Sequence, residues 1–350
     1  MRGGIQVRAE GGGGVKHDRI VLAHGGGGAL TQELVTKFIA PKLDNPALRP
    51  LEDAAVLTME AGEYAFTTDS YVVKPYRFPG GDIGKLAVCG TVNDLAVQGA
   101  QPLWLSLGLI LEEGLPLAEL ELIIESIRAT AASIGVQVVT GDTKVVERGQ
   151  GGGIYINTAG IGRVMAGRKL SAAGIQVGDA VIVSGTLGDH GVAVLSQREG
   201  IAFRTSVVSD CAPLWDLVKT ALDSGAEIHA MRDPTRGGLA ATVCDMAAAS
   251  GVGIRLHEPA LPVTAEVRGA CDLLGLDPLT IANEGKVVVV CRKTDAERVV
   301  AAMRGHPLGR EARVIGEATE KPKGMAVLRT VIGGERIIDM PTGEDLPRIC

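Results

Sequence analysis

Aromatic residues are scarce in this sequence: they make up 3% of its 350 residues, and no cluster of lysine and arginine stands out. Proteins that bind single-stranded nucleic acid stack bases on aromatic rings, and most nucleic-acid sites need a basic patch. The net charge of −6 also disfavours anionic partners such as a phospholipid surface. We therefore expect neither nucleic acid nor a membrane among the partners of this protein.

Long apolar runs and paired cysteines are missing as well. No apolar stretch approaches the roughly 20 residues that a transmembrane helix needs. Residues 1–18 are glycine-rich and polar and lack the apolar core of a signal peptide, so we expect a cytoplasmic protein. The six cysteines lie far apart without a CxxC pair, which fits reduced thiols rather than a disulfide framework or a zinc site. They are Cys89, Cys211, Cys244, Cys271, Cys291 and Cys350.

Aliphatic residues are plentiful enough for two cores. Hydrophobic residues make up 46% of the chain, and 350 residues suggest two domains of ordinary size. Strand-like and helix-like segments alternate, with hairpins among them, which predicts an α+β fold with mixed sheets flanked by helices rather than a doubly wound parallel sheet. We expect a disordered extension at 1–16, domains at 17–165 and 166–335, and a flexible tail at 336–350.

Two segments of the first half are predicted to form a hairpin that brings acids together. Residues 53–59 and 64–69 read as strands joined by a glycine turn. That register places Asp53 beside Asp69 or Ser70. Two carboxylates so close repel each other unless a cation lies between them, and magnesium suits hard oxygen ligands. Two solvated acids at strand ends explain the pattern equally well.

Polar residues interrupt two apolar segments farther along the chain. The pair Asn93-Asp94 stands inside a helix predicted over 82–100, where two short polar residues are poor choices. The motif Gly141–Lys144 follows a buried strand at 136–139, and polar residues at the exit of a strand are where α/β sites usually lie. Lys144 beside acids suggests contact with a phosphate or with a proton to be moved. A lone lysine in a loop is usually only solvated, so a functional role for Lys144 depends on the acidic residues around it.

For three other features, residue spacing alone does not distinguish a functional role from a structural one. The run Gly25–Gly28 ahead of a helix at 31–39 can close on a phosphate, but a flexible connector is the commoner role. His190 can serve as a base, although a hydrogen-bonded histidine at a helix start is more common. Glu284 stands at the mouth of a strand at 287–291 and is either a base or simply a turn acid.

The last residue of the sequence is a cysteine. Cys350 ends the stretch 346–350, and the proline, glycine and acidic residues before it are typical of a tail rather than of a strand or helix. A thiol on a mobile tail can be carried from one site to another. Exposure alone does not make a thiol functional, so a chance exposed cysteine is an equal alternative at this point.

Taken in order, the motifs resemble a known family. Four of them are similar to the PurM-like (AIR synthetase-like) ATP-dependent superfamily: Asp53–Val56, Thr67–Ser70, Val92–Ala96 and Gly141–Lys144. Three more narrow the resemblance to the hydrogenase maturation proteins of the HypE family: Asp233–Gly238, Asn283–Lys286 and Pro347–Cys350. The similarity runs from about residue 17 to residue 350.

The resemblance implies a two-domain PurM-like fold and an activity. A carbamoyl group carried on Cys350 would be dehydrated with ATP to an S-cyanate, the source of cyanide for a nickel–iron hydrogenase centre. A carbamoyltransferase (HypF) would load the thiol, and a HypC–HypD complex would receive the cyano group. The pattern of the family makes Cys350, Lys144 and Glu284 the catalytic residues. It also implies a homodimer formed through the N-terminal sheets.

The resemblance further assigns residues to two implied cofactors, ATP and Mg²⁺. Magnesium held by four aspartates would neutralise the charge of the ATP phosphates and align them. These metal ligands are Asp53, Asp69, Asp94 and Asp142. The residues implied in nucleotide binding are the same four acids together with Asn93 and Thr143.

Two other interpretations compete with this one. Another PurM-like enzyme, such as a selenophosphate synthetase or a thiamine-phosphate kinase, needs no cysteine at the end of the chain. The first of these usually has its reactive cysteine in a glycine-rich N-terminal segment, and here no cysteine precedes Cys89. A non-catalytic thiol carrier would leave the four acids, Lys144 and Glu284 as coincidences. Loss of water from a carbamoylated tail would exclude the carrier.

Overall fold

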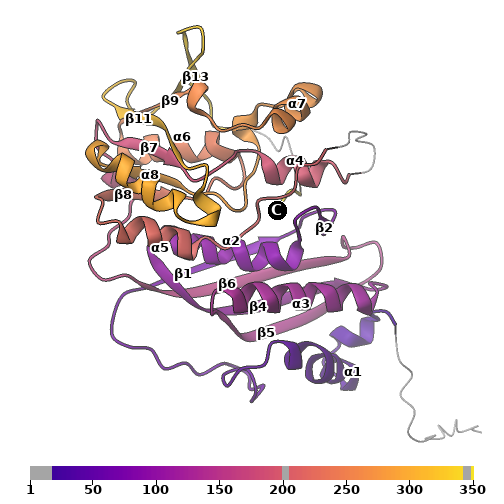
Figure 1. Cartoon of the computed structure of the whole chain (residues 1–350). Coiled ribbons are helices and arrows are strands. Elements are labelled where there is room, and N and C mark those ends of the chain that lie inside the picture. The colour runs from indigo at the N-terminus through magenta and orange to yellow at the C-terminus, as the bar shows by residue number, and fades with distance from the viewer. Residues whose placement is uncertain (1–17, 199–204, 342–347) are drawn as a thin grey trace, which may run out of the picture.

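The computed structural model describes residues 18–198, 205–341 and 348–350. The chain forms two halves, each built on one large sheet with helices packed against it (Figure 1). The half coloured indigo to magenta comes first in the sequence, and the half coloured mostly orange and yellow follows it. The C-terminal end lies between the two halves (Figure 1). The extension predicted to be disordered, at 1–16, lies outside the described residues.

The sheet of the first half has the strand order β1-β6-β4-β5, with β4 and β5 parallel and the other pairs antiparallel. Its strands are β1 (Tyr64–Tyr71), β4 (Ala100–Glu112), β5 (Gln137–Val146) and β6 (Ile154–Val164), and a small ribbon is formed by β2 (Arg77–Phe78) and β3 (Gly81–Asp82). The helical segments are η1 (Leu22–Gly25), α1 (Ala29–Glu33), η2 (Leu34–Ile39), η3 (Ala40–Lys42), α2 (Ile83–Val97) and α3 (Leu117–Ser133).

The sheet of the second half has the order β13-β12-β9-β11-β7-β10-β8, with β12 and β9 parallel and the other neighbours antiparallel. Its strands are β7 (Ala180–Val183), β8 (Ile228–Arg232), β9 (Gly253–His257), β10 (Val288–Cys291), β11 (Arg313–Thr319), β12 (Ala326–Arg329) and β13 (Glu335–Ile338). The helices are α4 (Asp189–Leu195), α5 (Trp215–Asp223), α6 (Gly238–Ser250), α7 (Ala265–Leu274) and α8 (Ala296–Arg304). Short helical turns are η4 (Ala172–Gly174), η5 (Glu258–Ala260), η6 (Pro278–Thr280), η7 (Lys293–Asp295) and η8 (Pro307–Gly309).

Strand β10 shows why the second half folds as three layers. Its residues are all apolar and all buried, because helices cover both faces of the sheet. Val289 and Cys291 pack in the same cluster as residues of α5 and α8, whereas Val288 and Val290 pack with residues of α6. A continuous apolar run is therefore required here, and an alternating pattern would leave polar side chains in one of the two cores.

Helix α2 lies where the two halves meet, so it is buried on almost every side. Asp82 begins the helix, because its side chain accepts a hydrogen bond from the N–H of Lys85 at 2.9 Å and satisfies a free amide of the first turn. Polar residues on α2 can therefore contact the second half.

No helix among the described residues combines the length and the apolar character needed to cross a membrane.

The predicted α+β class with mixed sheets is confirmed, but the predicted hairpin is wrong. Residues 53–59 form no strand, and β1 pairs with β6, so that Asp69 lies opposite Thr158. Local preference is not sufficient for a strand, which forms only where it finds an edge to pair with. Asp53 and Asp69 are therefore not neighbours in a hairpin.

A second correction concerns the motif at 141–144. The prediction ends a strand at Val139, whereas β5 continues to Val146, so the motif lies inside the strand. The parallel pairing of β5 with β4 runs through Gly141, where an added Cβ would lie 2.5 Å from the carbonyl oxygen of Leu107. A glycine that resembles a turn in the sequence marks a close approach of two backbones instead.

His229 in β8 forms hydrogen bonds to two carboxylates of the second half. Its Nδ1 lies 2.6 Å from Oδ2 of Asp179, which precedes β7, and its Nε2 lies 3.1 Å from Oε1 of Glu227. Burial alone lowers the pKa of His229, but these two bonds outweigh burial and raise the pKa above its usual 6.5. Stability from a raised pKa is fully present below the unfolded value and is lost as the pH rises through the folded value.

We expect His229→Gln to lower the free energy of unfolding by about 1 to 3 kcal/mol near pH 6. The loss should be smaller near pH 9, because the wild-type imidazole is then neutral and its bonds to the carboxylates are weaker. Urea unfolding at both pH values measures the difference. His257→Gln, on β9, serves as the control, since the described residues show no carboxylate bonded to it. An equal loss at both pH values would contradict the charged pairing.

Candidate active site between the two halves

Residues 348–350 lie against the chain that leaves β1. The N–H of Val72 donates to the carbonyl oxygen of Cys350 at 3.3 Å, and the N–H of Lys74 donates to that of Arg348 at 3.0 Å. The numbering falls on one strand as it rises on the other, so the tail runs antiparallel, as a short strand added to an edge. The end of the predicted flexible tail is therefore docked between the two halves (Figure 1).

The side chain of Arg348 anchors the tail. Its guanidinium lies 5.4 Å from the centre of the Tyr155 ring and donates to the Tyr155 hydroxyl at 3.0 Å and to the Val72 carbonyl at 3.2 Å. Arg198 donates in turn to the carbonyl of Arg348 at 2.8 Å. Arg348 has a φ of 55°, a left-handed conformation that costs about 1 kcal/mol or more for a residue with a side chain. The surrounding contacts hold it there.

Ile349 places the end of the tail in the core of the first half. Its side chain is 5% exposed, and Cys350 is half-buried beside the same cluster. The carbonyl oxygen of Ile349 accepts a hydrogen bond from Nε2 of His190 at 2.8 Å. His190, the second residue of α4, is completely buried and also bonds through Nδ1 to the hydroxyl of Ser209 at 2.8 Å. The hydrogen-bonded alternative for His190 thus holds in this structure.

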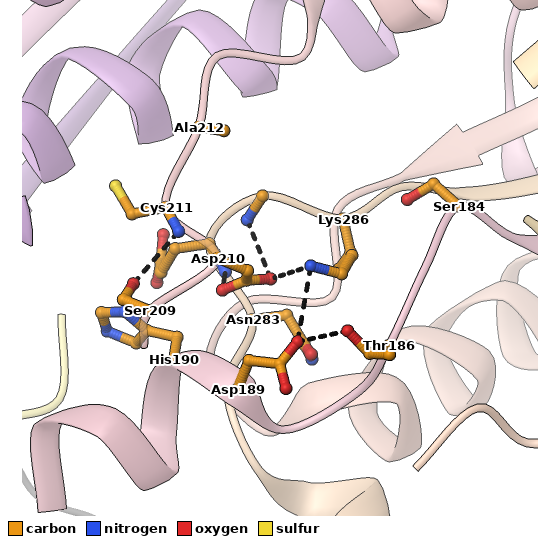
Figure 2. Close-up of polar contacts among 12 residues, drawn as sticks. Ser184, Thr186, Asp189, His190, Ser209, Asp210, Cys211, Ala212, Asn283 and Lys286 are labelled. Atoms are coloured by element: carbon orange, nitrogen blue, oxygen red, sulfur yellow. Dashed lines mark hydrogen bonds and ion pairs between the residues drawn. The ribbon is translucent and has the colours of Figure 1, made fainter. Parts of the chain in front are cut away.

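The turn that carries Glu284 is held by Asp210 (Figure 2). Its carboxylate accepts hydrogen bonds from the N–H of Glu284 at 3.0 Å, from the N–H of Gly285 at 3.3 Å and from Nζ of Lys286 at 2.9 Å. An added Cβ at Gly285 would lie 1.8 Å from the carbonyl oxygen of Asp210, so only glycine fits. The Glu-Gly-Lys order is therefore explained by one acceptor that binds three successive residues.

Asp210 and Lys286 form a buried ion pair. Burial alone raises the pKa of Asp210, but the charge of Lys286 and the backbone hydrogen bonds outweigh burial and lower that pKa. A second carboxylate, Asp189, lies 3.7 Å from the same ammonium group and accepts a hydrogen bond from the hydroxyl of Thr186. Burial raises the pKa of Asp189. Such a satisfied buried network is rigid, so it fixes the position of the neighbouring turn.

The carboxyl group of Glu284 has no such partners. The residue is 2% exposed, and its Oε1 accepts no hydrogen bond from any described residue. Burial is the main cause that raises the pKa of Glu284 well above its usual value, and the neighbouring Cys211 and Asp210 add to it. Burial therefore favours the protonated form of this group. A buried polar atom without a partner costs about 1 to 3 kcal/mol and indicates a position kept for a ligand or a reaction.

Asp69 and Asp94 lie close together, whereas the predicted pairing of Asp53 with Asp69 does not form. Asp69 reaches from β1 toward α2, which carries Asp94, and the hydroxyl of Thr67 donates to Oδ2 of Asp94 at 2.8 Å. Burial and the charge of Asp94 raise the pKa of Asp69 to about 6, and the same causes raise the pKa of Asp233 to about 7. A cavity of about 400 Å³ opens beside Asp94 and Asp233. Protons or a cation relieve the repulsion among these acids.

Asn93 joins the two halves from inside α2. Its Oδ1 accepts a hydrogen bond from the N–H of Leu214 at 2.8 Å, and its Nδ2 donates to the carbonyls of Ala212 at 3.2 Å and Glu284 at 3.4 Å. This explains a residue that is a poor choice for a helix interior. The amide of Asn93 is engaged within the chain and contacts the backbone at Glu284, and its predicted contact with the nucleotide stays a prediction.

The remaining predicted residues lie elsewhere. Asp142 and Lys144 form an ion pair of 2.9 Å with each other on β5, and burial of Thr143 puts its side chain on the other face. All three border a cavity of about 200 Å³ that is otherwise mostly apolar and that the glycine run also lines. Asp53 is exposed. Among the described residues, no group of three or more histidine, cysteine, aspartate or glutamate side chains is arranged to hold a metal ion.

Sequence reasoning missed Ser209 and Asp210. They lie between α4 and α5 in a stretch without helix or strand, where residue spacing carries no period. One signal was available: Lys286 directly precedes a strand of buried valines, and a lysine in such a place is almost never buried without an acidic partner. A buried Lys286 therefore requires an acidic partner, but the sequence does not identify which acid it is.

Comparison with known proteins defines the class of the fold and of this site. The family described as "AIR synthase related protein, N-terminal domain" matches residues 51–164, and the family described as "AIR synthase related protein, C-terminal domain" matches residues 176–329. Both matched segments contribute to the site, since Asp94 belongs to the first and Glu284 to the second. The chain is thus an AIR synthase-related protein with its candidate site between the two matched segments.

More similar relatives narrow this class. The carbamoyl dehydratase HypE of Cupriavidus necator is 50% identical over 337 residues, which are 96% of each chain. A crystal structure of the hydrogenase maturation protein HypE in complex with ATP has a TM-score of 0.90 at 44% identity and covers 94% of this chain and 99% of that one. A chain of a HypE–HypF complex has a TM-score of 0.77 at 46% identity, covering 90% of this chain and 100% of that one. The chain belongs to the HypE family of carbamoyl dehydratases.

Proposed function

We propose that this chain is an ATP-dependent carbamoyl dehydratase that converts an S-carbamoyl group on Cys350 into an S-cyanate, the source of cyanide for a nickel–iron hydrogenase centre. One observation carries the proposal. The tail that bears Cys350 docks between the two halves and accepts a hydrogen bond from His190. His190 in turn bonds to Ser209, and the next residue, Asp210, holds the turn of Glu284. The substrate thiol and an unpartnered acid are thus parts of one site, and membership of the HypE family supports the reaction.

The chemistry requires the amide oxygen to leave. Transfer of the γ-phosphoryl group of ATP to that oxygen releases ADP and leaves an S-bound imidate phosphate, as one proton departs from the nitrogen. Cleavage of the carbon–oxygen bond then releases inorganic phosphate, and the second nitrogen proton leaves as the carbon–nitrogen triple bond forms. The products are the S-cyanate, ADP and phosphate, so the elements of water end in the phosphate and the released protons.

Glu284 suits the proton steps. Its Oε1 is buried and has no partner among the described residues, so in its ionised form it can accept a proton from the nitrogen. Burial excludes the water that would otherwise compete for the phosphoryl group. Lys144 as the second proton-handling residue stays a prediction. In this structure it pairs with Asp142, and no hydrogen bond or ion pair among the described residues joins it to the tail.

The cofactors proposed are ATP and Mg²⁺, and the HypE–ATP complex supports the first. The mostly apolar cavity beside Gly25 suits a purine, and Asp142 and Thr143 at its border suit polar groups of the nucleotide. Asp69 and Asp94 fit a magnesium ion, because burial and then the charge of Asp94 raise the pKa of Asp69, and a cation would offset both. When bound there, the ion would neutralise phosphate charge. Asp53 and Asp142 stay predicted ligands.

The partners proposed follow the same chemistry. A HypF carbamoyltransferase would load Cys350, in keeping with the HypE–HypF complex, and a HypC–HypD complex would receive the cyano group in the cytoplasm. We also propose a homodimer through the first half. Strand β1 is an edge of its sheet, with Phe66 71% exposed upon it and Val56 92% exposed in the segment before it. An open edge with exposed apolar side chains favours pairing with another chain.

Mass measurement of the tail tests the function. Cleavage before aspartate releases the hexapeptide 345–350, whose mass reports the state of Cys350. After loading by HypF and incubation with ATP and magnesium, we expect the carbamoylated hexapeptide to lose the mass of one water molecule. Without ATP the carbamoyl group should stay intact. A carbamoyl group that also survives with ATP would mean that the chain is only a thiol carrier.

A further inference from the structure

We infer that His190 is a positioning residue of this site: it fixes the tail beside the Glu284 turn by donating its Nε2–H to the carbonyl oxygen of Ile349. The inference rests on the proposed function, in which Cys350 carries the reacting group. The bond of 2.8 Å binds the residue directly before that cysteine, so it sets the position of the thiol more closely than any contact of Arg348 can.

The hydrogen bonds determine the tautomer of His190. A carbonyl oxygen only accepts, so Nε2 must carry the proton toward Ile349. Burial lowers the pKa of His190, which keeps the ring neutral, and Nδ1 is then a bare acceptor. The hydroxyl of Ser209 must therefore donate to Nδ1, and its oxygen accepts the N–H of Cys211 at 3.1 Å. Every polar atom in this chain of bonds has a defined role.

The same chain of bonds leads to Glu284. Ser209 orients the ring of His190, and the next residue, Asp210, accepts the N–H groups of Glu284 and Gly285. The segment 209–211 therefore contacts His190, which binds the tail, on one side and the acid turn on the other. Figure 2 shows His190, Ser209 and Asp210 side by side. His190 is connected to that turn a second way, because the N–H of Gly188 at the start of α4 donates to Oδ1 of Asn283 at 2.8 Å.

The two backbone hydrogen bonds of the tail hold Cys350 in place less specifically than the bond from His190 does. The two backbone bonds of the tail use the groups of Val72 and Lys74, which water can replace when the tail leaves. The bond from His190 is different, because this ring is completely buried. If the tail undocks, Nε2–H loses its acceptor unless water enters, which costs about 1 to 3 kcal/mol. His190 thus favours the docked tail specifically.

Alkylation of Cys350 measures docking without relying on any catalytic step. Wild-type protein and variants are treated with iodoacetamide, and the hexapeptide 345–350 is quantified by mass. We expect His190→Leu, which fills the space but cannot donate, to label Cys350 about tenfold faster. His190→Gln retains a donor near the position of Nε2 and should restore slow labelling. Ser209→Ala, which only loses the group that orients the ring, should label about threefold faster.

The controls separate docking from folding and from chemistry. His229→Gln weakens the second half without touching the tail, so it should label at the wild-type rate. In single-turnover dehydration, His190→Leu should lower the rate of S-cyanate formation about tenfold while the KM for ATP stays the same. Wild-type labelling rates in both His190→Leu and Ser209→Ala would overturn the inference. If His190→Leu does not fold, the Ser209→Ala rate decides alone.

The two proposals fail in different ways. A wild-type protein that protects Cys350 through His190 yet never forms S-cyanate would refute the proposed function and leave the docking role intact. A wild-type protein that forms S-cyanate, with variants that dock and react normally, would refute the role of His190 alone.

Discussion

Replacement of Cys350 by serine is expected to abolish S-cyanate formation completely. The carbon to be dehydrated is carried on the sulfur, and a serine hydroxyl is too weak a nucleophile to be loaded in its place. Stability and ATP binding should stay unchanged, because the contacts that dock the tail come from Arg348, from the Ile349 side chain and from the main chain. Mass analysis of the hexapeptide 345–350 and calorimetry of ATP binding measure the two effects.

Cys244→Ser is the matched control for this loss. Cys244 is the other half-buried cysteine, since the remaining four are buried, and its thiol donates to the carbonyl of Ile338. It should react as the wild type does. Cyanide delivery to a hydrogenase by the Cys350→Ser variant would show that the substrate is held on another group, and the proposed function would then be wrong.

Glu284→Gln is expected to slow dehydration of the loaded protein by about 10²- to 10⁴-fold, the usual contribution of a general base. Glutamine has the same shape, and it is neutral, as is the protonated form of Glu284 that burial favours. The backbone bonds to Asp210 should therefore survive, and the free energy of unfolding should change little. Single-turnover formation of S-cyanate, followed by mass, measures the effect.

Asp272→Asn, an exposed acid on α7, is the control for the loss of one negative charge. It should leave dehydration at the wild-type rate. The labelling rate of Cys350 in Glu284→Gln should also equal that of the wild type, because the role proposed for this acid is in the proton steps, and the tail is held by other residues. A variant that docks, binds ATP and dehydrates at the normal rate would exclude Glu284 from the proton steps.

Much of the class of this protein can be predicted from the sequence, because the chemistry constrains residue types at a few places. The order of Asp69, Asn93-Asp94 and Asn283–Lys286, with a cysteine at position 350, is enough to indicate the family, which the comparisons then show. The alternation of strand-like and helix-like segments, with hairpins among them, also predicts the mixed sheets correctly. These signals are local, so they survive without knowledge of the fold.

Pairing between distant segments could not be predicted. The partner of β1 is β6, which follows it by some 80 residues, and no local pattern distinguishes that partner from the segment at 53–59. The distribution of the acids follows from the same pairing: Asp69 faces α2, whereas Asp142 pairs with Lys144. Ser209 and Asp210 are equally hidden, since each acts through contacts that only the folded chain brings about. His190 could be recognised as a hydrogen-bonded histidine, but its partners Ile349 and Ser209 could not.

The docked end of the chain also changes the kinetic order of the reaction. The candidate active site and the Cys350 thiol belong to one polypeptide. The thiol is therefore present at the site at an effective concentration on the order of millimolar, whatever the concentration of the protein in the cell. Dilution therefore leaves the turnover of each loaded molecule unchanged, and a soluble thiol must exceed that local concentration to compete. Selection among cellular thiols is thus achieved by attachment, before any recognition of the carbamoyl group itself.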